Sequence, residues 1–433
     1  MPDAKPVTGF SAVELIMGED GCARDTGNIG NLCHNLVWSS YLNSGYKLTA
    51  SVDDPGFRVL SKLNVDSGYF RSGMACKFKA RCRLKTARPE IDNQTPFVDF
   101  YVTSLEDTSN SADRASFVFT AIDQASWLLN ANPASGKAYR GSISEVIRQV
   151  VSEFAPGVNL TIANTIDSNQ NIWYTFRQSP KNMILRMMEY GSAILPDKGR
   201  WVVSSESPNI LRVVDQSKAA SEKRGFYTWP RIERATEKNA GVIISYGAIK
   251  QNAWARLIAE TYSTGISTST GLYLDKVTDS EELYTGVTDK NTPNKLKTKV
   301  PVGRSFDKPQ DSEPPEIGRT FVRAIPELYS AGEIGLRYRD YLSGSGRQLY
   351  LDNLYGTNKL FIDTNGQGSF YDGRGLGSDT ITLEFLGADN LPFYAQGDWM
   401  LYGFKHVYNA GQWRTRLYLT RIHRDSTGKT VGQ

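Results

Sequence analysis

The segment CKFKARCRLK, residues 76–85, alternates apolar and basic side chains without a break. Successive side chains of a β-strand point to opposite faces, so this period of two predicts a half-buried strand. One face should place two thiols in a core as small apolar groups. The apolar positions are Cys76, Phe78, Ala80, Cys82 and Leu84, and the basic positions are Lys77, Lys79, Arg81, Arg83 and Lys85.

Other strand patterns lie at both ends of the chain. The runs FVDFYVTS (97–104) and ASFVFTAI (115–122), separated by the polar residues 105–114, predict a hairpin. Residues 399–408 and 413–423, joined by NAGQ, predict a closing hairpin. A content of 22 Tyr, 18 Phe and 8 Trp also favours β-structure.

Residues 136–215 change to a helical period. Residues 142–154 place apolar side chains on one helical face, Ser142 and Glu145 have capping-box spacing, and Pro156-Gly157 ends the element. Ser179 followed by Pro180 begins a second helix that Gly191 is expected to end. Strands are predicted at 171–176, 201–203 and 210–214, which makes a compact α/β unit.

Charge and hydropathy exclude several classes of protein. A formal net charge of +4 is too small for a chain whose main partner is bare nucleic acid. Residues 1–18 lack the basic and apolar regions of a signal peptide, and no run approaches about 18 apolar residues. We therefore expect neither export through the general pathway nor membrane insertion.

The sequence predicts no metal, cofactor or catalytic site. Cys22, Cys33, Cys76 and Cys82 lack the paired spacing of a zinc site, so they are expected to stay reduced and metal-free. The three histidines form no HExxH helix, and there is no G-x-S-x-G elbow or Walker loop. Asp363 to Gly368 begins like a calcium loop but has Arg374 at the twelfth position, so a turn at Asn365-Gly366 is expected.

Two stretches resemble baseplate hub proteins of contractile-tailed phages, a family related to late control protein D and the N-terminal part of VgrG. Residues 115–195 are similar to the family's passage from barrel to insert, including its aromatic-x-Gln-Ser turn. Residues 397–421 resemble its closing hairpin. The positions that match these patterns are Phe176, Gln178, Ser179, Gly397, Asp398, His406, Thr415 and Arg421.

The resemblance implies an α+β, mostly β fold of two tube-like β-barrel domains, an α/β insert and a loop-rich region. The expected boundaries are 1–135 for the first barrel, 136–215 for the insert, 216–330 for a β and loop-rich connecting region that belongs in part to the second barrel, and 331–433 for the second barrel with the C-terminal hairpin. It further implies a non-enzymatic homotrimer in the virion tail, assembled in the bacterial cytoplasm. Implied partners are the tail spike, the tail tube or tube-initiator protein and the baseplate wedge, with DNA passing through the channel without specific binding.

Two alternatives remain open at this point: a β-rich carbohydrate-binding tail or fibre protein, and a cell-wall hydrolase. The basic strand face is also open to two interpretations. Five like charges repel one another unless acidic groups lie opposite, so the face is either solvated surface or a surface that meets a partner or the channel.

Overall fold

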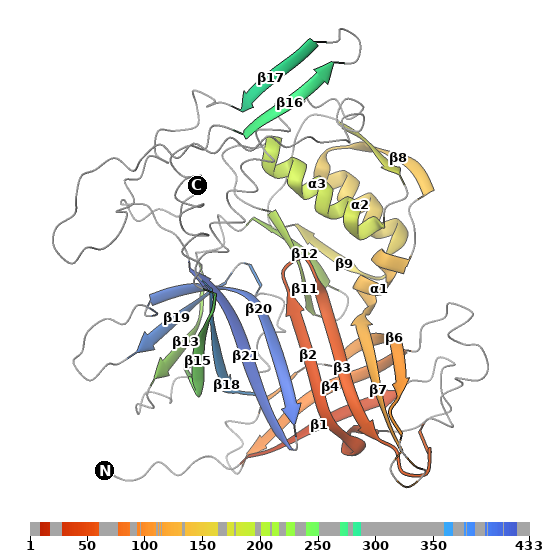
Figure 1. The fold of residues 1–433 in the computed structure, drawn as a ribbon, viewed down its shortest axis with the longest axis vertical. Coiled ribbons are helices and arrows are strands. Elements are labelled where there is room, and N and C mark those ends of the chain that lie inside the picture. The colour runs from red at the N-terminus through yellow and green to blue at the C-terminus, as the bar shows by residue number, and fades with distance from the viewer. Residues whose placement is uncertain are drawn as a thin grey trace, which may run out of the picture.

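The computed structural model describes residues 9–17, 28–59, 77–86, 93–95, 97–109, 111, 113, 115–131, 135–162, 171–176, 179–194, 201–207, 210–215, 222–229, 240–250, 269–275, 280–286, 359–366, 376–377, 379–385, 395, 397–409 and 411–421. Within these ranges the chain is mostly β, with three α-helices (Figure 1). The predicted predominance of β-structure is confirmed. No helix in these ranges is long and apolar enough to cross a membrane.

The N-terminal part forms antiparallel strands in the order β1-β4-β6-β7-β3-β2. Alternate residues of β7 are buried, as expected where one face of a sheet packs on a core. Ala80 and Cys82 of β4 are fully buried, which confirms the predicted core face at these positions. The bounds are β1 Gly9–Met17, β2 Cys33–Tyr41, β3 Gly45–Asp53, β4 Lys77–Thr86, β5 Asn93–Gln94, β6 Val98–Asp107 and β7 Ser116–Asp123, with a 3-10 turn at Gly30–Leu32.

The C-terminal part is built around β20 (Gly397–Asn409) and β21 (Gln412–Arg421), the predicted closing hairpin. Strands β18 and β15 extend the sheet beyond β21, and β19, β13 and β14 extend it from the first residues of β20. The β13 pairings with β19 and β14 are parallel. The bounds are β13 Glu222–Trp229, β14 Ala240–Val242, β15 Ser245–Lys250, β18 Lys359–Asn365 and β19 Asp379–Phe385.

One strand pair joins the two parts into a single sheet. Asn35 to Tyr41 of β2 pair antiparallel with Gly403 to Asn409 of β20, and Figure 1 shows β3, β2, β20 and β21 side by side. Buried side chains from both parts form one hydrophobic cluster behind this sheet. The two parts therefore share a core as well as a sheet.

The insert lies at one end of this sheet (Figure 1) and has a hydrophobic core of its own. Its helix α2 begins with the predicted capping box, in which the Ser142 hydroxyl accepts from the Glu145 amide and the Glu145 carboxylate accepts from the Ser142 amide. The bounds are α1 Gln124–Ala131, β8 Ser135–Gly141, α2 Ile143–Phe154, β9 Asn159–Ile162, β10 Asn171–Phe176, α3 Pro180–Ile194, β11 Trp201–Ser207 and β12 Ile210–Asp215.

Several predicted boundaries were wrong. Helix α3 continues past Gly191 to Ile194, because one glycine lowers helix propensity by only about 1 kcal/mol. Helix α1 and strand β8 were not predicted, and strand β6 extends to Asp107, into the expected loop. A separate hairpin, β16 (Ser269–Asp275) with β17 (Ser280–Gly286), lies in a stretch that matched no pattern. Cys22, Cys76, Gln178 and all of residues 287–358 lie outside the described residues.

Candidate functional site

Residues near the two ends of the chain meet where β2 pairs with β20. Trp38 of β2 lies opposite Leu48 of β3 on one side and opposite His406 of β20 on the other. His406 in turn lies opposite Thr415 of β21, and all four side chains are fully buried. We call this row of four residues the seam, because it crosses from the N-terminal to the C-terminal part of the sheet.

His406 is the polar centre of the seam. Its Nδ1 lies 2.8 Å from the Thr415 hydroxyl and 3.3 Å from Trp413 Nε1, which only donates, so Nδ1 acts as an acceptor and the ring is neutral. Burial lowers the pKa of His406 to about 3. The Trp38 ring meets the imidazole edge to face at 6.0 Å. These contacts hold the junction of the two parts and leave His406 no role as a proton donor near neutral pH.

Gly403 marks the point where one edge of β20 changes partner. Residues 397–400 of this edge pair with β19, and residues 403–409 pair with β2. A Cβ atom on Gly403 would lie 2.3 Å from Tyr41 Cδ1 and 3.1 Å from the Ser40 carbonyl oxygen. The close approach of the Tyr41 ring therefore requires glycine at this position.

The turn between β2 and β3 contacts the insert. The Asn43 amide donates to the Val203 carbonyl at 2.7 Å, and the Val203 amide donates to Asn43 Oδ1 at 2.9 Å. Asn43 has a positive φ of 65°, a conformation that asparagine tolerates better than most residues. From α3, Lys181 Nζ donates to the Ser44 carbonyl at 3.2 Å. Strand β11 and helix α3 thus both hold this turn.

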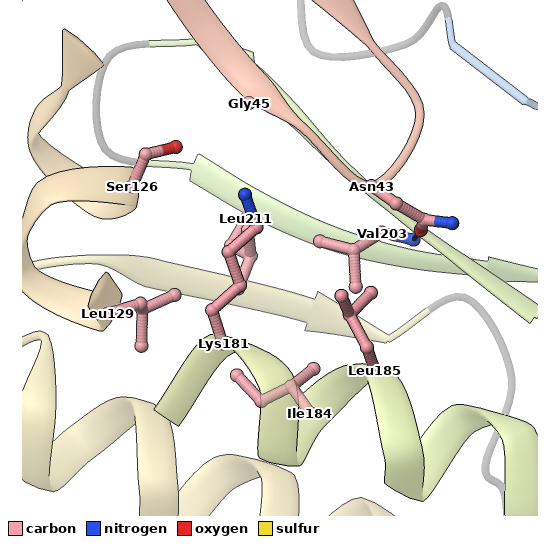
Figure 2. Close-up of a pocket in the computed structure, with 9 residues that line it drawn as sticks. All are labelled: Asn43, Gly45, Ser126, Leu129, Lys181, Ile184, Leu185, Val203 and Leu211. Carbon is pink, nitrogen blue, oxygen red and sulfur yellow. Dashed lines mark hydrogen bonds between the residues drawn. The ribbon is translucent and has the colours of Figure 1, made fainter. Parts of the chain in front are cut away.

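A small cavity of about 20 Å³ lies at this junction. Figure 2 shows Asn43 and Gly45 from the β2–β3 turn on one side and Lys181, Ile184 and Leu185 from α3 on the other. The remaining lining residues are Ser126, Leu129, Val203 and Leu211. This volume holds about one water molecule, so the cavity is a packing feature of the junction rather than a substrate pocket.

Asp123, at the end of β7, connects the sheet to the insert. Its carboxylate accepts from the Tyr46 amide at 2.9 Å and from the Ser126 amide at 3.2 Å, the second bond capping α1. Burial raises the pKa of Asp123, although these hydrogen bonds oppose the shift. Burial lowers the pKa of Lys181, and the charge of Asp123 opposes that shift. The two hydrogen bonds of Asp123 therefore tie the first turn of α1 to the start of β3.

The predicted basic strand is β4, a strand paired on both sides. Its register places Arg81 opposite Glu14 of β1 and Lys79 opposite Asp99 of β6. Residues directly opposite in an antiparallel pair share a face of the sheet, so two of the five cations have an acidic residue across from them. The other three basic residues, Lys77, Arg83 and Lys85, lie opposite uncharged residues.

The positions carried by the hub resemblance are spread over the fold. Ser179 precedes α3, and its hydroxyl accepts from the Asn182 amide at 3.3 Å. Asp398 accepts from the Thr382 hydroxyl at 2.7 Å across β19 and β20. Arg421 lies opposite Trp399 in register. Only His406 and Thr415 are brought together, in the seam, and Gln178 lies outside the described residues.

The whole fold is similar to the solved structures of tail proteins. The structure is similar to a tail protein from Neisseria meningitidis MC58, with a TM-score of 0.52 and 11% identity over 95% of this chain and 97% of that chain. It is also similar to the 43 kDa tail protein of prophage MuSo2 from Shewanella oneidensis, with a TM-score of 0.50 and 9% identity over 94% of this chain and 98% of that chain. The chain has the fold of phage tail proteins. No family model matches it, and no curated protein matches its sequence.

This tail-protein fold has no cluster of metal-ligating side chains within its described residues. Cys33 and Cys82 are buried free thiols, and burial raises the pKa of both, that of Cys33 to about 12. His34 is exposed and lies 3.3 Å from Asp53. Sequence reasoning assigned no role to Asn43, Asp123 or Lys181. Asp123 offered one signal, a capping residue followed by the helix formers of α1.

Proposed function

We propose that this chain is a structural subunit of a baseplate hub, in which three copies form a ring that joins a sixfold tail tube to a threefold spike and leaves a channel for DNA. The observation that carries the proposal is the β2–β20 pairing, which sets a sheet from each half of the chain edge to edge. Three such chains contribute six sheet units under threefold symmetry. Closed symmetry of this kind satisfies both the sixfold and the threefold partner.

The proposed domains are a first tube-like barrel at 1–135, the α/β insert at 136–215, a connecting region at 216–330 that belongs in part to the second barrel, and the second barrel at 331–433. The pairing of β13 with β19 and of β15 with β18 supports the partial assignment of the connecting region to the second barrel. The insert would face partners outside the tube, since the Asn43, Asp123 and Lys181 contacts hold it at one end of the sheet.

We assign the hub no catalytic role, and its proposed partners are proteins of the tail. They are the spike, the tube or tube-initiator protein and the baseplate wedge, all in the virion tail after assembly in the host cytoplasm. The basic residues of β4 are a proposed contact surface for one of these partners or the channel. Acidic residues opposite Lys79 and Arg81 weaken the case at those positions and leave Lys77, Arg83 and Lys85 as its stronger part.

The mass of the particle in solution tests the trimer. One chain has a mass of 48.2 kDa, so light scattering on the purified protein, alone and with its cognate spike, should give about three times that value. A stable monomer in both samples contradicts the proposal. For β4, the Lys77→Glu, Arg83→Glu and Lys85→Glu variant should lose ring formation at low salt. If assembly at low salt is unchanged, the basic residues of β4 are ordinary solvated surface and do not contact a partner or the channel.

A cluster of three tyrosine side chains favours a second function, carbohydrate binding. The rings of Tyr41 and Tyr418 lie 5.2 Å apart on the sheet face opposite the core, and Tyr402 lies 6.1 Å from Tyr418. Exposed aromatic faces stack well on sugars, but these side chains are half-buried against one another. Calorimetry with host polysaccharide tests this function, and binding that Tyr418→Ala abolishes would favour it over the hub.

A further inference from the structure

The sheet that crosses the seam has a second face, which carries a row of cations. Trp38, Leu48, His406 and Thr415 are buried, so the residues that alternate with them lie on the opposite face. Lys47 of β3 lies opposite Ser39 of β2, which lies opposite Lys405 of β20, which lies opposite Arg416 of β21. Arg414 lies two residues from Arg416 on the same face. We call Lys47, Lys405, Arg414 and Arg416 the basic row.

The basic row is dense in charge. With strands about 4.8 Å apart, the three steps from Lys47 to Arg416 span about 14 Å. Lys47 and Arg414 are exposed, Lys405 is half-buried, and the Arg416 side chain is 38% exposed. The row therefore presents four cations over a short distance on a surface that other molecules can reach.

The Asp363 carboxylate pairs with one member of the row, Arg416, and its charge also acts on a second, Arg414. Arg416 donates to both oxygens of Asp363, at 2.7 and 2.9 Å, and Asp363 also accepts from the Ser245 hydroxyl at 2.6 Å. Burial alone would raise the pKa of Asp363, but these bonds and the charges of Arg416 and Arg414 hold it below its usual value. Among the described residues, no carboxylate forms an ion pair with Lys47, Lys405 or Arg414.

The arrangement is unfavourable for the isolated chain. Lys405 lies directly opposite Arg416, and like charges at directly opposite positions destabilise a strand pair. The residues beside the row on the same face include the polar Ser39, Thr49 and Asn35 as well as the apolar Val37 and Val407. A bound polyanion would offset the repulsion, and hydroxyl and amide groups of this kind donate to phosphate oxygens without reading a base sequence.

We propose that the basic row binds the phosphate backbone of duplex DNA through charge alone. DNA fits better than an acidic peptide because it carries one charge per about 1.7 Å of its axis, which gives every cation of the row a phosphate within reach. The proposal rests on the proposed function only for the position of this face, toward the channel. The binding itself is a property of one folded chain.

Fluorescence anisotropy with labelled 30-bp duplexes of two unrelated sequences tests the proposal in a salt series. With three phosphate contacts, from Lys47, Lys405 and Arg414, the association constant of the parent should fall about 40-fold between 50 and 200 mM salt. In the Lys47→Glu, Lys405→Glu, Arg414→Glu variant, which keeps the Arg416–Asp363 pair, none of these contacts remains and binding of the duplex should be lost even at 50 mM salt. Both duplexes should give the same values.

A matched control reverses three exposed arginines elsewhere: Arg58→Glu, Arg140→Glu and Arg148→Glu. This control changes the net charge by the same amount and should keep the salt dependence of the parent. If the charge-reversal variant does not fold, the corresponding Lys47→Gln, Lys405→Gln, Arg414→Gln variant replaces it. Circular dichroism on each protein verifies folding.

Three results would overturn the proposal: no binding of duplex by the parent at 50 mM salt, an equal loss in the control, or capture of polyglutamate in preference to DNA. The last result would assign the row to an acidic protein segment. Light scattering on the same samples separates this proposal from the hub. If the protein is a monomer that binds DNA through the basic row, the trimeric hub is contradicted and DNA binding is not. If the protein is a trimer that does not bind DNA, DNA binding by the basic row is contradicted and the hub is not.

Discussion

His406 should make the stability of the protein depend on pH between 7.5 and 5.0. Its pKa is about 3 in the folded chain and about 6.5 in the unfolded chain, so the unfolded state binds more protons in this window. Stability is therefore highest above pH 6.5 and falls as the pH decreases toward the folded pKa. At pH 5.0, about 1.5 units below the unfolded pKa, the loss is about 2 kcal/mol.

Urea denaturation followed by tryptophan fluorescence measures this loss, because Trp38 and Trp413 both contact His406. The His406→Phe, Thr415→Val variant removes the imidazole together with a hydroxyl that bonds it, and it should lose about 2 kcal/mol less than the parent between the two pH values. The His34→Gln variant changes an exposed histidine and serves as the control. The free energy of unfolding of this variant should depend on pH as that of the parent does.

If the free energy of unfolding changes equally with pH in the parent and the double variant, His406 is not the source of the pH dependence. The same holds for an NMR titration in which the His406 ring protonates near pH 6.5 in the folded protein. The titration needs only the unmodified chain, so it decides the matter even where the double variant fails to fold.

Other contacts give further predictions. Gly403→Ala should lower stability by about 1–3 kcal/mol through overpacking against Tyr41, measured by thermal melting with Ser39→Ala as a control. An unchanged melting temperature would contradict the requirement for glycine at this position. Asp123→Ala should cost about 2–5 kcal/mol because it leaves two buried amides without an acceptor, whereas Asp123→Asn should cost less; equal losses would contradict the hydrogen-bond account. Cys33 should resist thiol reagents at pH 8 until urea unfolds the chain, and finding a cross-link or about one equivalent of zinc would contradict this.

Local patterns predicted the elements whose partners are close in sequence. The capping box at Ser142 and Glu145 and the hairpin of β20 and β21 follow from nearby residues alone. Helix α1 was missed because its capping residue, Asp123, also ends an alternating strand, and the apolar period of the strand dominated the pattern.

The seam was beyond local reasoning. Trp38 and His406 are separated by most of the chain, and which strands pair depends on the packing of the whole core. The same holds for the basic row, whose members come from β3, β20 and β21. Sequence reasoning instead selected β4, where five cations are contiguous in the pattern, but could not see that Glu14 and Asp99 lie across from two of them.

Electron microscopy of the purified chain, alone and with its spike, tests the hub most directly. If the chain is a hub subunit, the images should show a threefold annulus with a central hole. Each subunit of the annulus should contribute two sheet units joined by the β2–β20 pair. Monomeric particles in both samples, or an oligomer without a hole, would contradict it.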